Sequence, residues 1–308
     1  MDVVLVRAGA LGDLLLLRPT LAALRASGHR VHLLAPLAPG RALVGPGAAD
    51  TLHASDGPEL AAALADGFAD GPIARALAAA DAVVAFTRSE ALLERLAGRA
   101  RRLIAHDPAP PAAGPHAAAW LARAVAPLVG ERELAAATAL EAPPLVFTDE
   151  ERRKAEALVR DLPQGFVALH PGSGSPKKNW LLDRWREAAA QLANGAPWLF
   201  VVGPAEAALL PPEGALLARE WPLRTLAAAL SRAGIFVGND AGVSHLAAAA
   251  GAPTLALFGP TDPAVWAPVG TRALALRAPD GSLEGLAVAD VVAAACRLRA
   301  TAVGPPSG

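Results

Sequence analysis

Residue types that bind anions gather in one segment, LHPGSGSPKKNW at residues 169–180. Gly172 and Gly174 would let backbone N–H groups approach a phosphate, and a lysine at 177 or 178 would add a point charge. The chain has only three lysines and three asparagines, and two of those lysines and one asparagine stand here. An ordinary exposed loop with solvated lysines is the alternative, but the concentration of rare types favours a phosphate site. The G-x-x-x-x-G-K spacing of a Walker A loop is absent.

A second segment, FVGNDAGVSHL at residues 236–246, runs into an alanine-rich stretch. Asp240 is predicted to cap a helix that begins at Ala241. Gly242 leaves the N-terminus of that helix uncovered, so a diphosphate could bind to its free N–H groups. His245 lies one turn further, on the same side. A lone histidine on such a helix is usually structural, but together with the open N-terminus it favours a ligand contact.

The third segment is RAGALGD at residues 7–13, directly after the first predicted strand. Gly9 and Gly12 permit a tight turn, and Asp13 falls in the first turn of the following helix. The G-x-G-x-x-G spacing is absent and no acidic residue ends the second strand, so a dinucleotide site is not indicated. Asp13 either complements the helix dipole or presents a carboxylate at the end of the strand. The residues alone leave both interpretations open.

A fourth segment, ALFGPTDPAVWAP at residues 256–268, places Thr261, Asp262 and Trp266 in a loop after a predicted strand. Asp262 could equally restrain its own backbone turn. No histidine, cysteine and carboxylate set has zinc-like spacing, no G-x-S-x-G occurs, and Cys296 has no evident base. We therefore predict no metal site.

The elements that would position these segments alternate between short β-branched runs and Ala/Leu-rich helices, which is typical of parallel α/β sheets. In the first half we expect strands at 3–6, 30–35, 82–86 and 102–105, and helices at 11–27, 58–65, 89–97 and 117–128. In the second half we expect strands at 166–170, 198–202, 235–237, 254–258 and 273–276, and helices at 149–160, 182–193, 223–233, 241–250 and 286–299.

The proline-rich residues 141–144 break the helical pattern and mark the predicted boundary. The domains are then 1–144 and 145–303, each Rossmann-like and doubly wound, followed by a disordered tail at 304–308. The last helix could pack back on the N-terminal domain. Such sheets bind ligands outside the carboxyl ends of their strands, so we expect the two domains to face each other across a shared cleft.

Composition agrees with two packed domains. The 308 residues are 53 % hydrophobic and 19 % charged, which excludes disorder. A net charge of −1, with neither half polycationic, makes nucleic acid a poor candidate partner. The single cysteine cannot form an internal disulfide, so we expect a reducing cytoplasm.

Membrane contact has one candidate site. The apolar N-terminus is interrupted by Arg7, Asp13 and Arg18, so neither a membrane span nor a signal peptide is expected. A group of arginines could meet lipid-linked phosphate at the inner membrane surface, although a solvated helix end is the simpler interpretation. These are Arg95, Arg99, Arg101 and Arg102.

Taken together, three segments resemble glycosyltransferase family 9, the lipopolysaccharide heptosyltransferases. They are ALGD at 10–13, HPGSGSPKKNW at 170–180 and GNDAGVSHLAAAAGAPTLALFGPTDP at 238–263. Their order and separation match over nearly the whole chain. The resemblance implies a GT-B fold, an inverting transfer from an ADP-heptose-type donor to a glycan or glycolipid acceptor, and neither metal nor cofactor.

The resemblance also implies roles for single residues. The aspartate that matches Asp13 is the general base of the family, and Ser173 and Gly174 align with a donor-phosphate loop. The residues that match donor contacts are Lys178, Glu206, Asp240, Gly242 and His245. The segment around Glu206 is the weakest match. Ala241 departs from the family, which usually has Ser or Thr there, and thereby removes a hydroxyl that could bond a phosphate oxygen.

Two other functions remain open from the sequence. A GT-B nucleotide-sugar epimerase would need no acceptor, so product analysis separates it from a transferase. A degenerate GT-B module could serve only for binding, although the presence of Asp13 speaks against this. A dinucleotide dehydrogenase is more remote because its fingerprint is missing.

Overall fold

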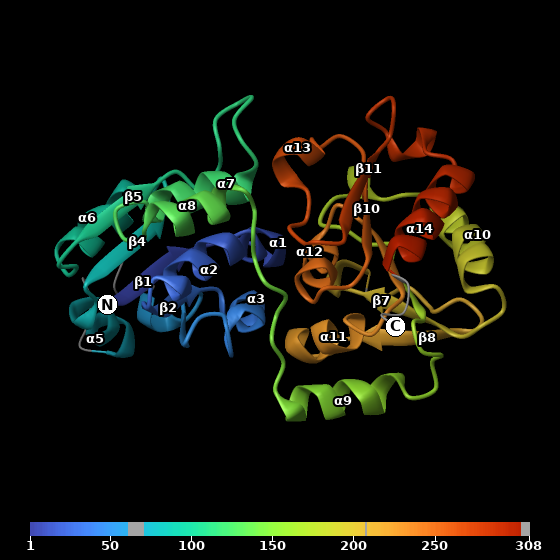
Figure 1. Ribbon diagram of the computed structural model, residues 1–308, viewed down its shortest axis with the longest axis horizontal. Coiled ribbons are helices and arrows are strands. Elements are labelled where there is room, and N and C mark those ends of the chain that lie inside the picture. Colours follow the sequence, from blue (N-terminus) through green and yellow to red (C-terminus); the bar gives the residue numbers. More distant parts are fainter. Residues whose placement is uncertain (61–70, 207, 303–308) are drawn as a thin grey trace. The chain divides into compact units, whose positions relative to one another are not determined.

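The computed structural model describes residues 1–60, 71–206 and 208–302. The chain divides into two compact units, Met1–Val146 and Phe147 onward. The division falls two residues after the predicted boundary at 144/145. Each unit is built around one parallel sheet with helices packed on it (Figure 1). The predicted tail at 304–308 and most of the helix expected at 58–65 lie outside the described residues.

The first sheet has the order β3-β2-β1-β4-β5, and its described strands are all parallel. Its central strands are continuous apolar runs because helices cover both faces of a doubly wound sheet. One face packs on α5 and α6 through residues such as Val4, Val83 and Leu77. The strands are β1 Asp2–Arg7, β2 Arg30–Ala35, β3 Thr51–Ala54, β4 Ala82–Phe86 and β5 Leu103–His106.

The helices of the first unit include a packed group formed by α2, α7 and α8. Their bounds are α1 Leu11–Leu15, α2 Arg18–Ala26, α3 Leu37–Gly40, α5 Pro72–Ala79, α6 Glu90–Ala97, α7 Ala117–Ala122 and α8 Glu131–Thr138. Short 3₁₀ helices follow α3 and α7, at η1 Arg41–Leu43 and η2 Arg123–Val125.

The second sheet has the order β11-β10-β9-β6-β7-β8 and is also parallel. Numbered from its own first strand, this is the 3-2-1-4-5-6 order of a Rossmann sheet seen from the other edge. The switch point, where the direction of winding reverses, therefore lies between β6 and β9. The strands are β6 Val167–His170, β7 Trp198–Val202, β8 Ala215–Arg219, β9 Ile235–Asn239, β10 Thr254–Phe258 and β11 Ala273–Arg277.

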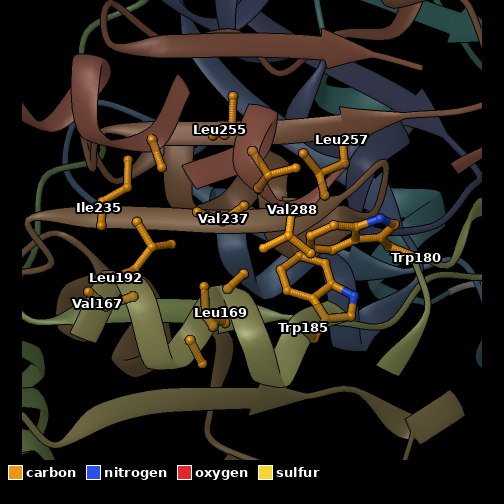
Figure 2. Close-up of a cluster of buried hydrophobic side chains, with 14 of the residues drawn as sticks. Val167, Leu169, Trp180, Trp185, Leu192, Ile235, Val237, Leu255, Leu257 and Val288 are labelled. Carbon is orange, nitrogen blue, oxygen red and sulfur yellow. The ribbon is translucent and has the colours of Figure 1, made fainter. Parts of the chain in front are cut away.

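Helices α10 and α14 pack against each other on one face of this sheet, and α11 packs against α12 and α9. Figure 2 shows the core beneath α10 and α14, where the rings of Trp180 and Trp185 meet edge to face with centroids 5.2 Å apart. Helix α14 also packs on β9, β10 and β11. The helices are α9 Asp149–Val159, α10 Leu182–Ala193, α11 Leu223–Leu230, α12 Gly242–Ala249, α13 Pro263–Trp266 and α14 Val288–Ala302. The described part of the second unit also contains the short 3₁₀ helices η3 Pro176–Lys178, η4 Pro204–Glu206 and η5 Leu283–Gly285.

The single helix expected at 11–27 was wrong, because the structure has α1 and α2 with a break at Leu16 and Leu17. Pro19 stands in the first turn of α2, where its missing N–H costs nothing, whereas inside one continuous helix its ring would clash with a carbonyl. Two edge strands, β3 and β8, and the helices α3, α5, α8 and α13 were not predicted.

Candidate functional site

The switch point of the second sheet brings two of the predicted segments together. Strands β6 and β9 are hydrogen-bonded neighbours, with His170 opposite Gly238. The loop at 171–180 leaves β6 and residues 240–242 leave β9 at the same edge of the sheet. Parallel sheets bind ligands at this position because the connections on either side diverge.

Asp240 is the residue on which the loops converge. Its Oδ2 lies 2.7 Å from Nζ of Lys178 and accepts a hydrogen bond from Oγ1 of Thr261 at 2.6 Å. The carboxylate of Asp240 is 8 % exposed and the side chain of Lys178 is 29 % exposed. A charge this buried depends on its partners, since an unpaired carboxylate would pay the cost of desolvation.

The prediction that Asp240 caps α12 was wrong. The N-cap of α12 is Ala241, in extended conformation and without a side-chain hydrogen bond to the helix. Asp240 is turned instead toward Lys178 and Thr261. The N-terminus of α12 is therefore left without a capping side chain. Its free N–H groups and positive dipole end suit an anion.

Asn239, the last residue of β9, holds the 171–180 loop at both ends. Its Nδ2 donates to the carbonyl of Pro171 at 2.6 Å, and its Oδ1 accepts from the N–H of Trp180 at 3.3 Å. The side chain is fully buried. Asn239 is one of only three asparagines in the chain, and the sequence analysis did not place it among the site residues. The signal was its rarity combined with its position beside Asp240.

Ser173 was expected to contact a donor phosphate, but its hydroxyl bonds within its own loop. Oγ lies 2.7 Å from both the carbonyl of Ser175 and Oδ1 of Asn179, and it accepts from the N–H of Ser175 at 3.2 Å. The side chain is buried. Gly174 is exposed, and a Cβ there would meet no heavy atom within 4 Å. The backbone at Gly174 is thus the accessible part of the loop.

Glu206 lies beneath the same loop although it comes from η4, after β7. It is buried, and its Oε2 accepts from the N–H of Gly203 at 3.0 Å. A Cβ on Gly172 would overlap the carboxyl group of Glu206, so any larger residue at 172 would push this carboxyl group from its place. Burial lowers the pKa of His170, against the carbonyl of Val201 and the charge of Glu206, which both raise it. The structure therefore brings Glu206 to the loop that carries Lys178.

His245 is buried in the first turn of α12, next to Ser244. Ser244 donates to the carbonyl of Asn239 at 2.6 Å and so ties the helix to β9. Gly238 must be glycine, because a Cβ there would meet Oγ of Ser244. The start of α12 is in this way fixed against the switch point.

Asp13 belongs to the switch point of the first sheet, between β1 and β4. Its Oδ2 accepts from the N–H of Ala10 at 2.9 Å, and Oδ1 lies 3.5 Å from Nη2 of Arg7. The Asp13 side chain is 40 % exposed, whereas that of Arg7 is 3 % exposed and donates to the carbonyl of Pro108. Burial lowers the pKa of Arg7, and the Asp13 and Asp107 carboxylates raise it. An accessible carboxylate is thus oriented by a buried cation.

The local interpretation of Asp262 is confirmed. Its Oδ1 accepts from the N–H of Ala264 at 3.0 Å and caps the short helix α13. Its neighbour Thr261, in contrast, points to Asp240. Of these two adjacent residues, Asp262 therefore has a structural role, and Thr261 belongs to the candidate site.

Within the described ranges, no three histidine, cysteine or acidic side chains are grouped so that they could hold a metal ion. No helix in those ranges combines the length and apolar character needed to cross a membrane.

A family model described as glycosyltransferase family 9 (heptosyltransferase) matches residues 128–287, more than half of the chain. The chain belongs to this family. Lipopolysaccharide heptosyltransferase 1 of Escherichia coli O18:K1:H7 (strain RS218 / NMEC) is 32 % identical over 137 residues, which are 42 % of this chain and 41 % of that protein. The match thus spans less than half the length of this relative.

Solved structures of family 9 proteins have the same fold. A glycosyl transferase family 9 protein from Veillonella parvula DSM 2008 has a TM-score of 0.76 at 19 % identity, covering 97 % of each chain. The E. coli ADP-heptose lps heptosyltransferase II has a TM-score of 0.74 at 19 % identity, covering 99 % of this chain and 100 % of that one. E. coli heptosyltransferase WaaC with ADP has a TM-score of 0.69 at 20 % identity, covering 97 % and 100 %. The predicted GT-B class is confirmed.

Proposed function

We propose that this family 9 chain is an inverting glycosyltransferase that uses a nucleotide-diphosphate sugar of the ADP-heptose type. The acceptor is a saccharide hydroxyl of a lipopolysaccharide or similar glycan. The observation that carries the proposal is the group Lys178, Asp240 and Thr261 at the switch point of the second sheet, beside the uncapped N-terminus of α12. Two related structures are described as complexes with ADP and with ADP-2-deoxy-2-fluoro heptose, which supports the choice of nucleotide.

In the proposed donor site the diphosphate lies against the N–H groups of Gly242 and the first turn of α12. Lys178 supplies the positive charge, and the accessible backbone of Gly174 forms part of the wall. Charge that develops on the leaving diphosphate is stabilised by the ammonium group of Lys178 and by the helix dipole, the part that a metal ion plays in other enzymes. Glu206 and His245 complete the donor contacts.

In the proposed acceptor site Asp13 takes the proton of the attacking hydroxyl. A sugar hydroxyl is a weak nucleophile, so the reaction needs a base within about 3 Å of the attacking oxygen. The exposed fraction of Asp13 makes it reachable, and the bonds from Ala10 and Arg7 fix its orientation.

A thermal-shift panel of ADP-, UDP-, GDP- and CMP-sugars tests the donor class. At 100 times its dissociation constant, a ligand that binds only the folded protein stabilises it by about 2.7 kcal/mol. We expect the ADP-linked sugar to give the largest shift. Transfer to lipopolysaccharide-type acceptors is then followed by product analysis. No shift with any of the four sugars would contradict the proposal, and a changed donor sugar without an acceptor would indicate an epimerase.

The proposal includes independence from metal ions, because Lys178 and the positive end of the α12 dipole are available to the diphosphate. We expect transfer to continue unchanged after exhaustive EDTA treatment. Activity that disappears and returns only with Mg²⁺ or Mn²⁺ would contradict this part of the proposal.

A further inference from the structure

Three connections of the second sheet meet at a single oxygen atom. Lys178 comes from the loop after β6, Asp240 from the end of β9, and Thr261 from the loop after β10. Both the ammonium group and the hydroxyl bind Oδ2 of Asp240, at 2.7 and 2.6 Å. Asp240 is therefore held twice on the same atom.

This arrangement conflicts with a simple phosphate-binding role for Lys178. The charge of Lys178 is already balanced by Asp240. To neutralise a diphosphate fully, the ammonium group must move away from that carboxylate. Asp240 is nearly buried. If Lys178 were its only partner, the departure of the lysine would leave the carboxylate unpaired, at a large cost in desolvation. The hydroxyl of Thr261 removes this difficulty because it binds Asp240 independently of the lysine.

We propose that Thr261 is a positioning residue that retains Asp240 while Lys178 transfers from Asp240 to the diphosphate of the donor. This inference rests on the proposed function of the site. Thr261 needs no contact with the nucleotide in this role. It lowers the cost of the bound state, in which Asp240 has given up its ion pair.

The first test replaces Thr261 by valine, which keeps the branched shape and removes only the hydroxyl. Loss of a hydrogen bond to a charged group changes a binding equilibrium by a factor of about 10 or more. We expect Thr261→Val to weaken ADP binding about 10-fold in calorimetry, and Thr261→Ser to restore it. Thr138→Val is the matched control, because the hydroxyl of Thr138 bonds only to carbonyls of its own helix.

A double-mutant cycle separates this role from a direct contact with the nucleotide. In the Lys178→Ala background Asp240 has the same partner before and after ADP binds. Thr261→Val should then change ADP affinity by less than about twofold, although it should lower the melting temperature more than it does in the wild type. A hydroxyl that touches ADP directly would instead cost the same factor of affinity in both backgrounds.

The outcomes distinguish this inference from the proposed function. A wild-type chain that binds none of the nucleoside diphosphates ADP, UDP and GDP would overturn both, even if it binds CMP. If one of these nucleotides binds, the cycle is run with that nucleotide. Wild-type affinity in a folded Thr261→Val variant, or equal losses in both backgrounds, would overturn the role of Thr261 and leave the proposed function intact.

Discussion

In the proposed donor site, some of the side chains already bind one another: Lys178 and Thr261 both bind Asp240. The family resemblance predicted that Lys178, Asp240 and Glu206 belong to one site, but it could not predict that Asp240 binds Lys178 rather than the helix N-terminus. That choice depends on the loops after β6 and β10, whose paths are set by packing over long sequence separations. Ser173 shows the same limit, because its hydroxyl is used inside its own loop.

Replacing Lys178 by alanine should weaken both donor binding and turnover. The charge counts more as the leaving group departs, so the loss in turnover adds to the loss in affinity. We expect a cost of about 1.5–3 kcal/mol in kcat/KM. Lys177→Ala is the matched control, because Lys177 is the exposed neighbour in the same loop. A damaging Lys177→Ala together with a silent Lys178→Ala would show that the wrong lysine was chosen.

Replacing Asp13 by asparagine should lower turnover by about 10²–10⁴-fold, because it removes the proposed base and keeps the shape. The amide oxygen can still accept the hydrogen bond from Ala10, so donor affinity and melting temperature should be nearly unchanged. Asp56→Asn is the control, since that carboxylate likewise accepts from a backbone N–H, that of Leu37. An early-melting Asp13→Asn variant with normal turnover would make Asp13 a structural residue.

At the scale of elements, the buried central strands and the edge strands β5 and β11 were predicted, whereas the other two edge strands, β3 and β8, were not. Runs such as those of β1 and β4 are almost wholly apolar because both faces of the sheet are covered. The edge strands β3 and β8 are partly exposed and mix polar with apolar residues, so their composition is close to that of loops. The start of α12 was predicted one residue early because Ala241 gives no capping signal.

The uncapped start of α12 offers a gain in stability. Ala241 already has the extended conformation of an N-cap, so a hydroxyl at this position could accept from the first turn. Ala241→Thr should therefore raise the free energy of unfolding by about 1 kcal/mol in chemical denaturation. Ala241→Val, which has the same shape without the hydroxyl, should give no such gain. Equal effects of both variants would exclude capping as the cause.

At the scale of the molecule, each unit repeats one winding scheme, and in each a candidate site residue follows the first strand of its sheet. The alternation of strands and helices predicted this scheme, and the carboxyl-end rule predicted where polar residues would gather. The titration of one buried and two half-buried histidines also affects the stability of the chain. Burial lowers the pKa of His53, His106 and His170, in each case as the largest cause.

These histidines should make stability fall on mild acidification. Because each has a lower pKa in the folded state, the unfolded chain binds more protons below about pH 6.5. Stability is therefore fully present above that pH and is lost as the pH falls toward 5, by up to about 1.4 kcal/mol per pH unit for fully buried His170. Urea titrations between pH 7.5 and 5 measure this slope. His170→Gln should reduce it, and an unchanged slope would exclude His170 as a contributor.

The close fit of Gly172 over Glu206 has a consequence for how this sequence can change by descent. Any side chain at 172 would displace the buried carboxyl group that accepts from the N–H of Gly203, so a mutation there should cost less once position 206 has become smaller. The reverse order is open, since a small residue at 206 leaves glycine at 172 unharmed. Substitutions along a lineage should therefore be ordered in time, with 206 changing first. Once 172 has acquired a side chain, a glutamate that returned at 206 would have to place its carboxyl group differently.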